Sequence, residues 1–267
     1  MFRRFYNMAS NPFSKGLPAS AAHPTDDIRE VHARLDHLAR TGGIGLVTAD
    51  PGMGKTFAVR AWAAKLNPNT TKMVYTCMST LTNIDFYRQL CAELGLEPCF
   101  KKSDMYRDVQ DRIRSLVDEK RMRVVIAIDE AQYLPSSVLR DLQMLANFDM
   151  DSRDMMALVL VGHSVLAQYL SRQPYESLRQ RIVVNYRMRG LDEAQAKEYV
   201  RSMLAGAGAD PDIFDDAALA GAYGVSGGSI RRLNSVVVNA LTIGAQQQAR
   251  AIDAEMVRSA AEELSLS

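Results

Sequence analysis

The chain has 267 residues, of which 47% are hydrophobic, and its formal net charge is +1. This length suits one large domain or a domain with a smaller appendage, and the apolar content is enough for a packed core. The charge is uneven, with 6 Lys or Arg against 11 Asp or Glu after residue 190, and 26 against 20 before it. A basic first part is compatible with a nucleic-acid-binding face, and equally with an ordinary solvated surface.

The cysteines, the histidines and the apolar runs exclude several classes of protein. Cys77, Cys91 and Cys99 form an odd set without C-x-x-C spacing, and the four histidines form no metal-ligand pattern, which argues against a disulfide framework and a zinc site. The N-terminus lacks the apolar core of a signal peptide, and the longest apolar run, residues 155–161, is too short to span a membrane. We therefore expect a cytoplasmic protein that does not bind a membrane.

Taken in chain order, helix-like segments alternate with short apolar runs. After an irregular lead-in, helices are predicted at residues 26–40, 57–64, 82–94, 103–118 and 136–147. Runs of β-branched type predict strands at residues 44–48, 72–77, 123–128, 156–161 and 181–186, the last of them an edge strand. The alternation predicts an α/β fold with a parallel five-stranded sheet.

The pattern changes near Leu191, after which no strand is predicted. Four helices are expected at residues 192–205, 215–223, 229–246 and 253–264. Asp192 and Asp253 suit helix N-caps, and Gly206 and Gly224 suit helix ends. The sequence thus predicts an α/β domain over residues 1–190 and a small all-helical lid over residues 191–267.

The most informative segment joins the first predicted strand to a helix. It reads Ala49-Asp50-Pro51-Gly52-Met53-Gly54-Lys55-Thr56. Strand, glycine-rich loop and helix are the context of a phosphate-binding P-loop, in which glycines let backbone amides approach the anion. Lys55 would reach the β- and γ-phosphates, and Thr56 would hold Mg²⁺. Ala49 stands where the full pattern has glycine, and a chance glycine-rich turn is the alternative.

A second segment predicts the acidic half of the site. The apolar run of residues 123–128 ends in Asp129 and Glu130. Asp129 would orient the metal's water shell, and Glu130 would polarise a water for attack on the γ-phosphate. The alternative is that both acids merely open the next helix, where acidic residues are favoured.

Further segments extend these two motifs. They are Asn11-Pro12-Phe13, Ile128–Leu134, Leu160–His163, Leu178–Ile182 and Gly228–Asn234. A P-loop α/β domain with a helical lid resembles the AAA+ ATPases, and this set of segments is similar to the ExeA-like group. That group includes helper ATPases encoded beside DDE transposases, which are relatives of TniB, TnsC and IstB.

The resemblance implies a role for each matching residue. Residues 50–56 would bind ATP, with Gly54, Lys55 and Thr56 as Walker A, and Asp129 and Glu130 as Walker B. Mg²⁺ would lie at Thr56 and Asp129.

Sensor positions follow from the same resemblance. His163 falls where the family places a polar sensor of the γ-phosphate, in place of the commoner Asn, Ser or Gln, and capping of the strand end is the alternative. Arg231 matches the lid arginine that contacts the γ-phosphate, and Arg232 is the fallback. Phe13 matches a segment that lies against the adenine, or is simply a core residue.

An arginine finger is implied near the last strand. Arg179 and Arg181 lie where AAA+ proteins carry the arginine that reaches a neighbouring subunit's nucleotide, so the resemblance implies a homo-oligomer, either a ring or a helical filament. One of the two would be the finger. A local ion pair with Glu176 or Asp192 is the alternative.

The resemblance also implies contact with double-stranded DNA through its phosphates. The candidates are Lys101, Lys102, Ser103 and Arg107, with Lys120, Arg121 and Arg123 as secondary candidates. A solvated charged surface is the alternative for each of them.

The predicted function is therefore that of an ATPase which assembles on duplex DNA and recruits a DDE transposase for target selection. We expect slow hydrolysis, stimulated by DNA or by oligomerisation. An ExeA-like ATPase with a protein client is the alternative; in secretion it would need a membrane span and an envelope-binding domain, which the sequence does not predict. A replication initiator would carry a winged helix after the lid, which is not predicted either, and a nucleotide-binding scaffold would not need Glu130.

Overall fold

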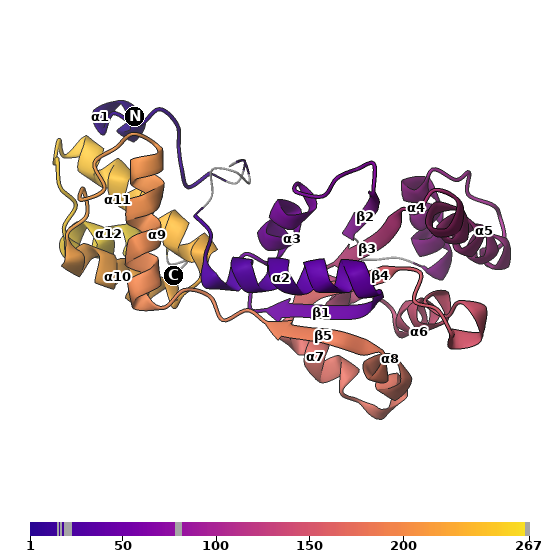
Figure 1. Cartoon of the computed structure of the whole chain (residues 1–267). Helices are drawn as coiled ribbons and strands as arrows, with labels where there is room; N and C mark the ends of the chain where they lie inside the picture. The colour runs from indigo at the N-terminus through magenta and orange to yellow at the C-terminus, as the bar shows by residue number, and fades with distance from the viewer. Residues whose placement is uncertain (15, 17, 19–22, 78–81, 265–267) are drawn as a thin grey trace. The chain divides into compact units, whose positions relative to one another are not determined.

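The computed structural model describes residues 1–14, 16, 18, 23–77 and 82–264. The chain divides into two compact units (Figure 1). The helical unit comprises Met1–Arg29, Pro51–Phe57 and Arg189–Ser267. The sheet unit comprises Glu30–Asp50 and Ala58–Met188.

Five parallel strands form the centre of the sheet unit, in the order β2-β3-β4-β1-β5. They are β1 (Gly43–Ala49), β2 (Thr71–Cys77), β3 (Arg123–Asp129), β4 (Ala157–His163) and β5 (Ile182–Arg187). The inner strands β1, β3 and β4 are almost wholly buried, which explains their continuous apolar sequences. Both the predicted α/β class and the predicted five-stranded parallel sheet are confirmed.

Helices follow most strands and supply the rest of the sheet unit's core. They are α2 (Asp26–Thr41), α3 (Lys55–Ala63), α4 (Asn83–Leu94), α5 (Lys102–Arg114), α6 (Ser136–Leu145), α7 (Ser164–Leu170) and α8 (Glu176–Gln180). Short turns of other helical types are η2 (Ser115–Glu119), η3 (Ala131–Tyr133), η4 (Asp149–Asp151) and η5 (Gln173–Tyr175). The predicted helix over residues 103–118 is thus α5 followed by the π-type turn η2.

The parallel arrangement places the carboxyl ends of four strands at one edge of the sheet. Ala49 at the end of β1 is the register partner of His163 at the end of β4. Cys77 at the end of β2 is the partner of Asp129 at the end of β3. Because β4 lies between β1 and β3, the position predicted as a sensor lies between the two strands that precede the nucleotide motifs.

The helical unit consists of α1 (Phe2–Phe5), α9 (Glu193–Gly206), α10 (Asp216–Ser226), α11 (Ile230–Gln246) and α12 (Ala254–Leu264). Its core includes Leu204, Phe214 and Leu241, and also Tyr6 from the lead-in, whose hydroxyl donates to the carbonyl of Ala249 at 2.9 Å. The lead-in was predicted as irregular and as part of residues 1–190. It forms a short helix and packs on α9–α12 because its apolar side chains are buried there.

Caps delimit the helices of this unit. Asp192 forms a capping box with Gln195 at the start of α9, as predicted. The prediction for Gly224 was wrong, because Gly224 lies inside α10. That helix instead ends at Gly227, which takes the left-handed conformation with φ of 57°. The domain boundary at residue 190 stays a prediction.

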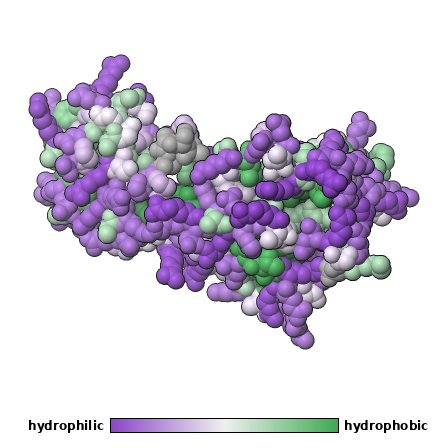
Figure 2. All heavy atoms as spheres, viewed as in Figure 1, coloured by the Kyte–Doolittle hydropathy of each residue, from purple (hydrophilic) through white to green (hydrophobic). Residues whose placement is uncertain are grey.

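The surface is largely polar on the face drawn in Figure 2, where hydrophilic residues predominate. Among the described helices, none combines the length and apolar character needed to cross a membrane.

Candidate nucleotide-binding and hydrolytic site

The predicted P-loop has the backbone that phosphate binding requires. Gly52 and Gly54 have φ of 82° and 93°, which glycine adopts without strain. The helix α3 begins immediately afterwards, at Lys55. Lys55 is 8% exposed, and Thr56 is exposed. A loop of this form directs backbone amides and the positive end of a helix at one point, which fits a phosphate group.

Within the helical unit, the P-loop packs against the start of α11. The backbone N–H of Arg231 donates to the carbonyl of Gly52 at 3.1 Å. A Cβ atom on Gly52 would lie 2.4 Å from Ser229 Oγ and 3.0 Å from Arg231 Cβ. The structure therefore brings the predicted lid arginine to the P-loop through its backbone, while its side chain is exposed.

The acidic pair lies at the end of β3 in the sheet unit. Asp129 is 1% exposed, and its Oδ1 accepts the backbone N–H of Glu130 at 2.8 Å. Its Oδ2 accepts the hydroxyl of Tyr75 at 2.9 Å. Glu130 takes the left-handed conformation, with φ of 53°, which is uncommon for a residue with a side chain and clusters at functional sites.

Tyr75 is a partner of Asp129 that sequence reasoning missed. Burial raises the pKa of Tyr75 well above its ordinary value, and the Asp129 carboxylate raises it further. The phenol therefore stays protonated and donates its hydrogen bond throughout the physiological pH range. Tyr75 holds the carboxylate that the sequence assigns to the metal.

Gln132 is the second missed residue. Its Nε2 donates to Glu130 Oε2 at 2.6 Å, and its Oε1 accepts the backbone N–H of His163 at 2.9 Å. The structure thus joins Glu130 to the predicted sensor position. The position of Gln132, two residues after Glu130 in the turn η3, was the available sequence signal.

The side chain of His163 has a local role. Its Nδ1 accepts the backbone N–H of Val165 at 3.5 Å, which caps α7. This agrees with a capping interpretation, although the cap is on the helix that follows β4.

Asp50, predicted to bind the nucleotide, already has partners in the sheet unit. Its Oδ1 accepts the hydroxyl of Ser164, and its Oδ2 lies 3.8 Å from the guanidinium of Arg187. Asp50 therefore ties the end of β1 to the beginning of α7 and the end of β5.

The two finger candidates lie beside each other in the chain with different surroundings. Arg179 is exposed at the end of α8, and its guanidinium donates to the carbonyl of Ser171 at 2.8 Å. Arg181 is partly buried and follows the same helix. Among the described residues, the local partner of Arg179 is thus the carbonyl of Ser171, and not the carboxylate of Glu176 or Asp192 that the alternative interpretation proposes.

Phe13 lies in the core of the helical unit, 7% exposed, with its ring centroid 6.5 Å from that of Tyr199. The structure shows the core role that the sequence offered as one of two interpretations.

The predicted DNA-contacting residues gather at the start of α5. Lys101, Ser103 and Arg107 are exposed. Lys102 is less exposed, pairs with Asp141 and lies 5.7 Å from the ring centroid of Tyr87. Its charge is therefore partly neutralised within the sheet unit, so Lys101 and Arg107 are the better candidates for a phosphate.

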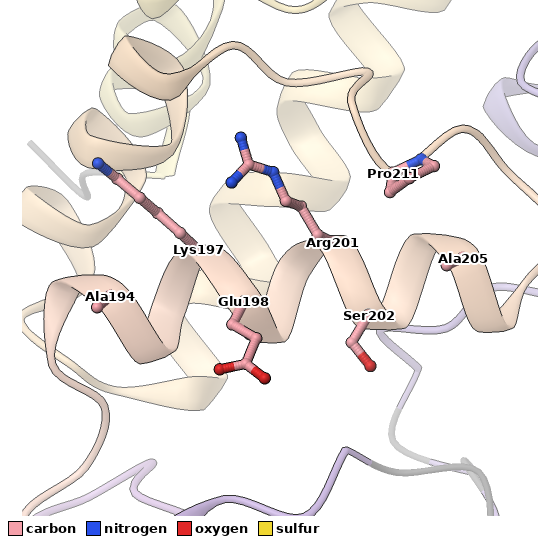
Figure 3. A pocket seen from close by; sticks show the side chains of 7 residues that line it. All are labelled: Ala194, Lys197, Glu198, Arg201, Ser202, Ala205 and Pro211. Atoms are coloured by element: carbon pink, nitrogen blue, oxygen red, sulfur yellow. The ribbon is translucent and has the colours of Figure 1, made fainter.

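No group of three or more His, Cys, Asp or Glu side chains within the described part of the chain is arranged to hold a metal ion. A hollow of about 530 Å³ on α9 contains none of the predicted site residues; its lining is Ala194, Lys197, Glu198, Arg201, Ser202, Ala205 and Pro211. Lys197 and Arg201 project to one side of the helix, and Glu198 and Ser202 to the other (Figure 3). Arg201 is held there by Asp212 and Asp216. Because no residue of the P-loop or of the acidic pair lines this hollow, we do not assign it to the nucleotide.

Comparison with known proteins agrees with the class that the fold and the P-loop define. Residues 38–170 match the family model of the AAA domain. The chain also resembles the Cdc6 protein of Pyrobaculum aerophilum, with a TM-score of 0.74 and 17% identity over 96% of this chain and 71% of that one. A DNA-bound origin recognition complex of Drosophila gives a TM-score of 0.72 and 15% identity over 100% of this chain and 66% of that one.

A more specific relative is the general secretion pathway protein A of Aeromonas hydrophila. It is 31% identical over 250 residues, which are 90% of this chain and 44% of that protein. The chain therefore spans less than half the length of this relative. Together, the fold and the family match support a P-loop AAA+ fold with an AAA domain over residues 38–170.

Proposed function

We propose that this protein is an ATP-dependent switch that assembles on duplex DNA and recruits a DDE transposase to its target. ATP and Mg²⁺ bind at residues 50–56 with Asp129, Glu130 is the general base, and one of Arg179 and Arg181 acts on a neighbouring subunit's nucleotide. Arg231 senses the γ-phosphate. Hydrolysis is slow and releases the assembly, because a nucleotide shifts the population only through its different affinity for two states.

The observation that carries the switch is the contact between the P-loop and α11. Arg231 donates its backbone N–H to Gly52, and Ser229 and Arg231 fill the space beside that glycine. A phosphate that reorders the loop must therefore move the start of a 17-residue helix. This is a direct mechanical route from nucleotide state to the helical unit.

The proposed DNA contact is supported by charge and exposure. Lys101, Ser103 and Arg107 are exposed around the first turns of α5, where basic groups and helix amides favour a phosphate, against the Asp104 carboxylate that accepts the Ser103 hydroxyl. Such contacts read the backbone and are nearly independent of base sequence.

A second candidate function is that of an ATPase whose client is a protein. The match to a secretion pathway protein over 90% of this chain favours it. It shares the nucleotide chemistry above and differs only in what the assembled form binds.

Lys55→Ala tests the coupling between nucleotide and DNA. The variant loses the cation that would neutralise the phosphates, so we expect ATP affinity to fall at least roughly a hundredfold, and ATP-dependent DNA binding with it. Fluorescent ATP and a fluorescent duplex report the two separately. DNA binding that survives the loss of ATP binding would contradict the switch.

Charge reversal at α5 separates the two clients. Lys101→Glu combined with Arg107→Glu should abolish duplex binding and leave ATP affinity unchanged, whereas Arg258→Glu, an exposed reversal on α12, should affect neither. If native protein binds no DNA in either nucleotide state, the protein-client function takes first place.

A further inference from the structure

Gln132 lies between a hydrogen-bond acceptor and a hydrogen-bond donor, and its side-chain amide satisfies both. One neighbour, the Glu130 carboxylate, accepts hydrogen bonds when ionised; the other, the backbone N–H of His163, only donates. The side-chain amide offers one donor and one acceptor in the required orientation. Reversing it would place oxygen against oxygen at Glu130 and nitrogen against nitrogen at His163.

The surrounding backbone is shaped around this amide. Gly162 is buried, and a Cβ atom on it would lie 2.7 Å from Gln132 Oε1 and 2.8 Å from Leu166 Cδ2. Any larger residue at position 162 would displace the amide oxygen from the His163 N–H. At the other end, Glu130 is held in left-handed backbone with φ of 53°, a strained conformation that persists where the surroundings enforce it.

We propose that Gln132 is a positioning residue that fixes the Glu130 carboxylate by tying it to the end of β4. This inference rests on the proposed role of Glu130 as general base. These two hydrogen bonds make the orientation of the Glu130 carboxylate depend on the position of His163 at the end of β4, which is the predicted sensor position. A displacement of His163 would therefore pass to Glu130 through two hydrogen bonds.

Gln132→Met tests the proposal, since methionine has a similar length and neither polar atom. We expect kcat for ATP hydrolysis to fall by about tenfold or more, because a base that is not oriented loses part of the roughly 10²–10⁴-fold that general-base catalysis contributes. KM for ATP should stay within about twofold, because Gln132 is not among the residues proposed to bind the nucleotide. Gln132→Glu keeps the acceptor for His163 but sets a second carboxylate against Glu130, so its kcat should fall further.

Gln110→Met is the matched control. Gln110 donates from Nε2 to the carbonyl of Asn147 at 3.2 Å in the same unit, so this change also removes one amide and one hydrogen bond. Its kcat and KM should be native. Gln132→Ala repeats the test without added bulk should the methionine variant not fold.

Gly162→Ala tests the tie to β4. With Gln132 present, the added methyl collides with both Oε1 and Leu166 Cδ2, and kcat should fall several-fold or more. In a Gln132→Ala background only the Leu166 collision remains, so the same change should lower kcat by a clearly smaller factor. Equal effects in both backgrounds would overturn the tie.

Glu130→Gln separates the proposed role of Glu130 as general base from the proposed role of Gln132 as its positioning residue. It should hydrolyse ATP poorly and stay on DNA longer with ATP. If it hydrolyses at the native rate, Glu130 is not the base and both proposals about this site fail. If it is inactive while Gln132→Met retains native kcat, the positioning role alone is overturned.

Discussion

Two glycines have similar left-handed φ angles, but their surroundings leave different amounts of space for a side chain. Gly52 in the P-loop has φ of 82°, and a Cβ atom there would collide with Ser229 Oγ at 2.4 Å. Gly95, at the end of α4, has φ of 75° and nothing within 4 Å of its ideal Cβ. A side chain at position 52 is therefore disfavoured by both backbone strain and crowding, whereas one at position 95 is disfavoured by backbone strain alone.

Alanine at each position should reveal this difference. Gly95→Ala meets only backbone strain, so we expect a loss of roughly 1 kcal/mol in the free energy of unfolding and unchanged ATP affinity. Gly52→Ala adds the collision, so we expect at least roughly 2 kcal/mol and a clear loss of ATP affinity. Urea unfolding and ATP titration measure both. Equal losses of stability would contradict the crowding at Gly52.

The motif residues of the candidate site could be named from the sequence, whereas their partners could not. Glycine spacing between a strand and a helix identifies Lys55, and an apolar run ending in acids identifies Asp129. Tyr75 and Gln132 are hydrogen-bond partners whose relevance depends on which strand lies beside which and on side-chain rotamers. Tyr75 lies in no short motif, and the segment Ile128–Leu134, which contains Gln132, does not show that its side chain contacts His163.

At the scale of elements, α2 and α3 are joined within the sheet unit by polar contacts. His32 on α2 lies with Nε2 3.0 Å from the carbonyl of Ala58 and Nδ1 3.2 Å from Lys65 Nζ. Trp62 Nε1 donates to Asp36 at 2.7 Å. The two histidine contacts fit a neutral ring that donates from Nε2 and accepts at Nδ1.

This geometry predicts a loss of stability in acid. Burial lowers the pKa of His32, and Lys65 lowers it further, against the opposing effects of the Ala58 carbonyl and Asp36. The unfolded chain, with an ordinary histidine pKa of about 6.5, therefore takes up the proton more readily. The His32 contribution is complete above that pH and is lost as the pH falls below it towards the folded-state pKa.

His32→Gln should remove this part of the pH dependence, because glutamine can still donate to Ala58 and does not titrate. Urea unfolding at about pH 7.5 and about pH 5.5 gives the comparison. His37→Gln, an exposed change on the same helix, should keep the native slope. A native slope in His32→Gln would show that other groups cause the acid sensitivity.

Element types followed from periodicity more reliably than element ends. All five predicted strands agree with the structure within about a residue or two; the buried strands β1, β3 and β4 form continuous apolar runs, and β2 and β5 are rich in β-branched and aromatic residues. Helix ends depend on local backbone geometry instead. Gly224 and Gly227 are equally plausible stops in the sequence, and only the latter takes the left-handed conformation.

At the scale of the whole molecule, the sequence predicts the division into a sheet-containing and a helical part, but not the placement of the lead-in. Its few apolar residues, among them Tyr6 and Met8, show no period that would identify their partner helices. Their burial on the C-terminal helices follows from tertiary packing alone.

The fold determines where a nucleotide could bind, but it does not determine which macromolecule the protein binds. Structures with TM-scores above 0.7 share only 15–17% identity with this chain. Such similarity establishes a common architecture, while the client depends on surface residues such as Lys101 and Arg107 that architecture does not determine.

If ATP makes this protein bind DNA through its phosphates, binding to a fluorescent random-sequence duplex shows it most directly. Native protein is titrated with a non-hydrolysable ATP analogue or with ADP, between about 50 and about 200 mM salt. We predict tight, cooperative binding with the analogue only, weakening at least roughly tenfold across the series because counterions are released from the phosphates. Binding that is equal with both nucleotides, or absent with both, would contradict the account.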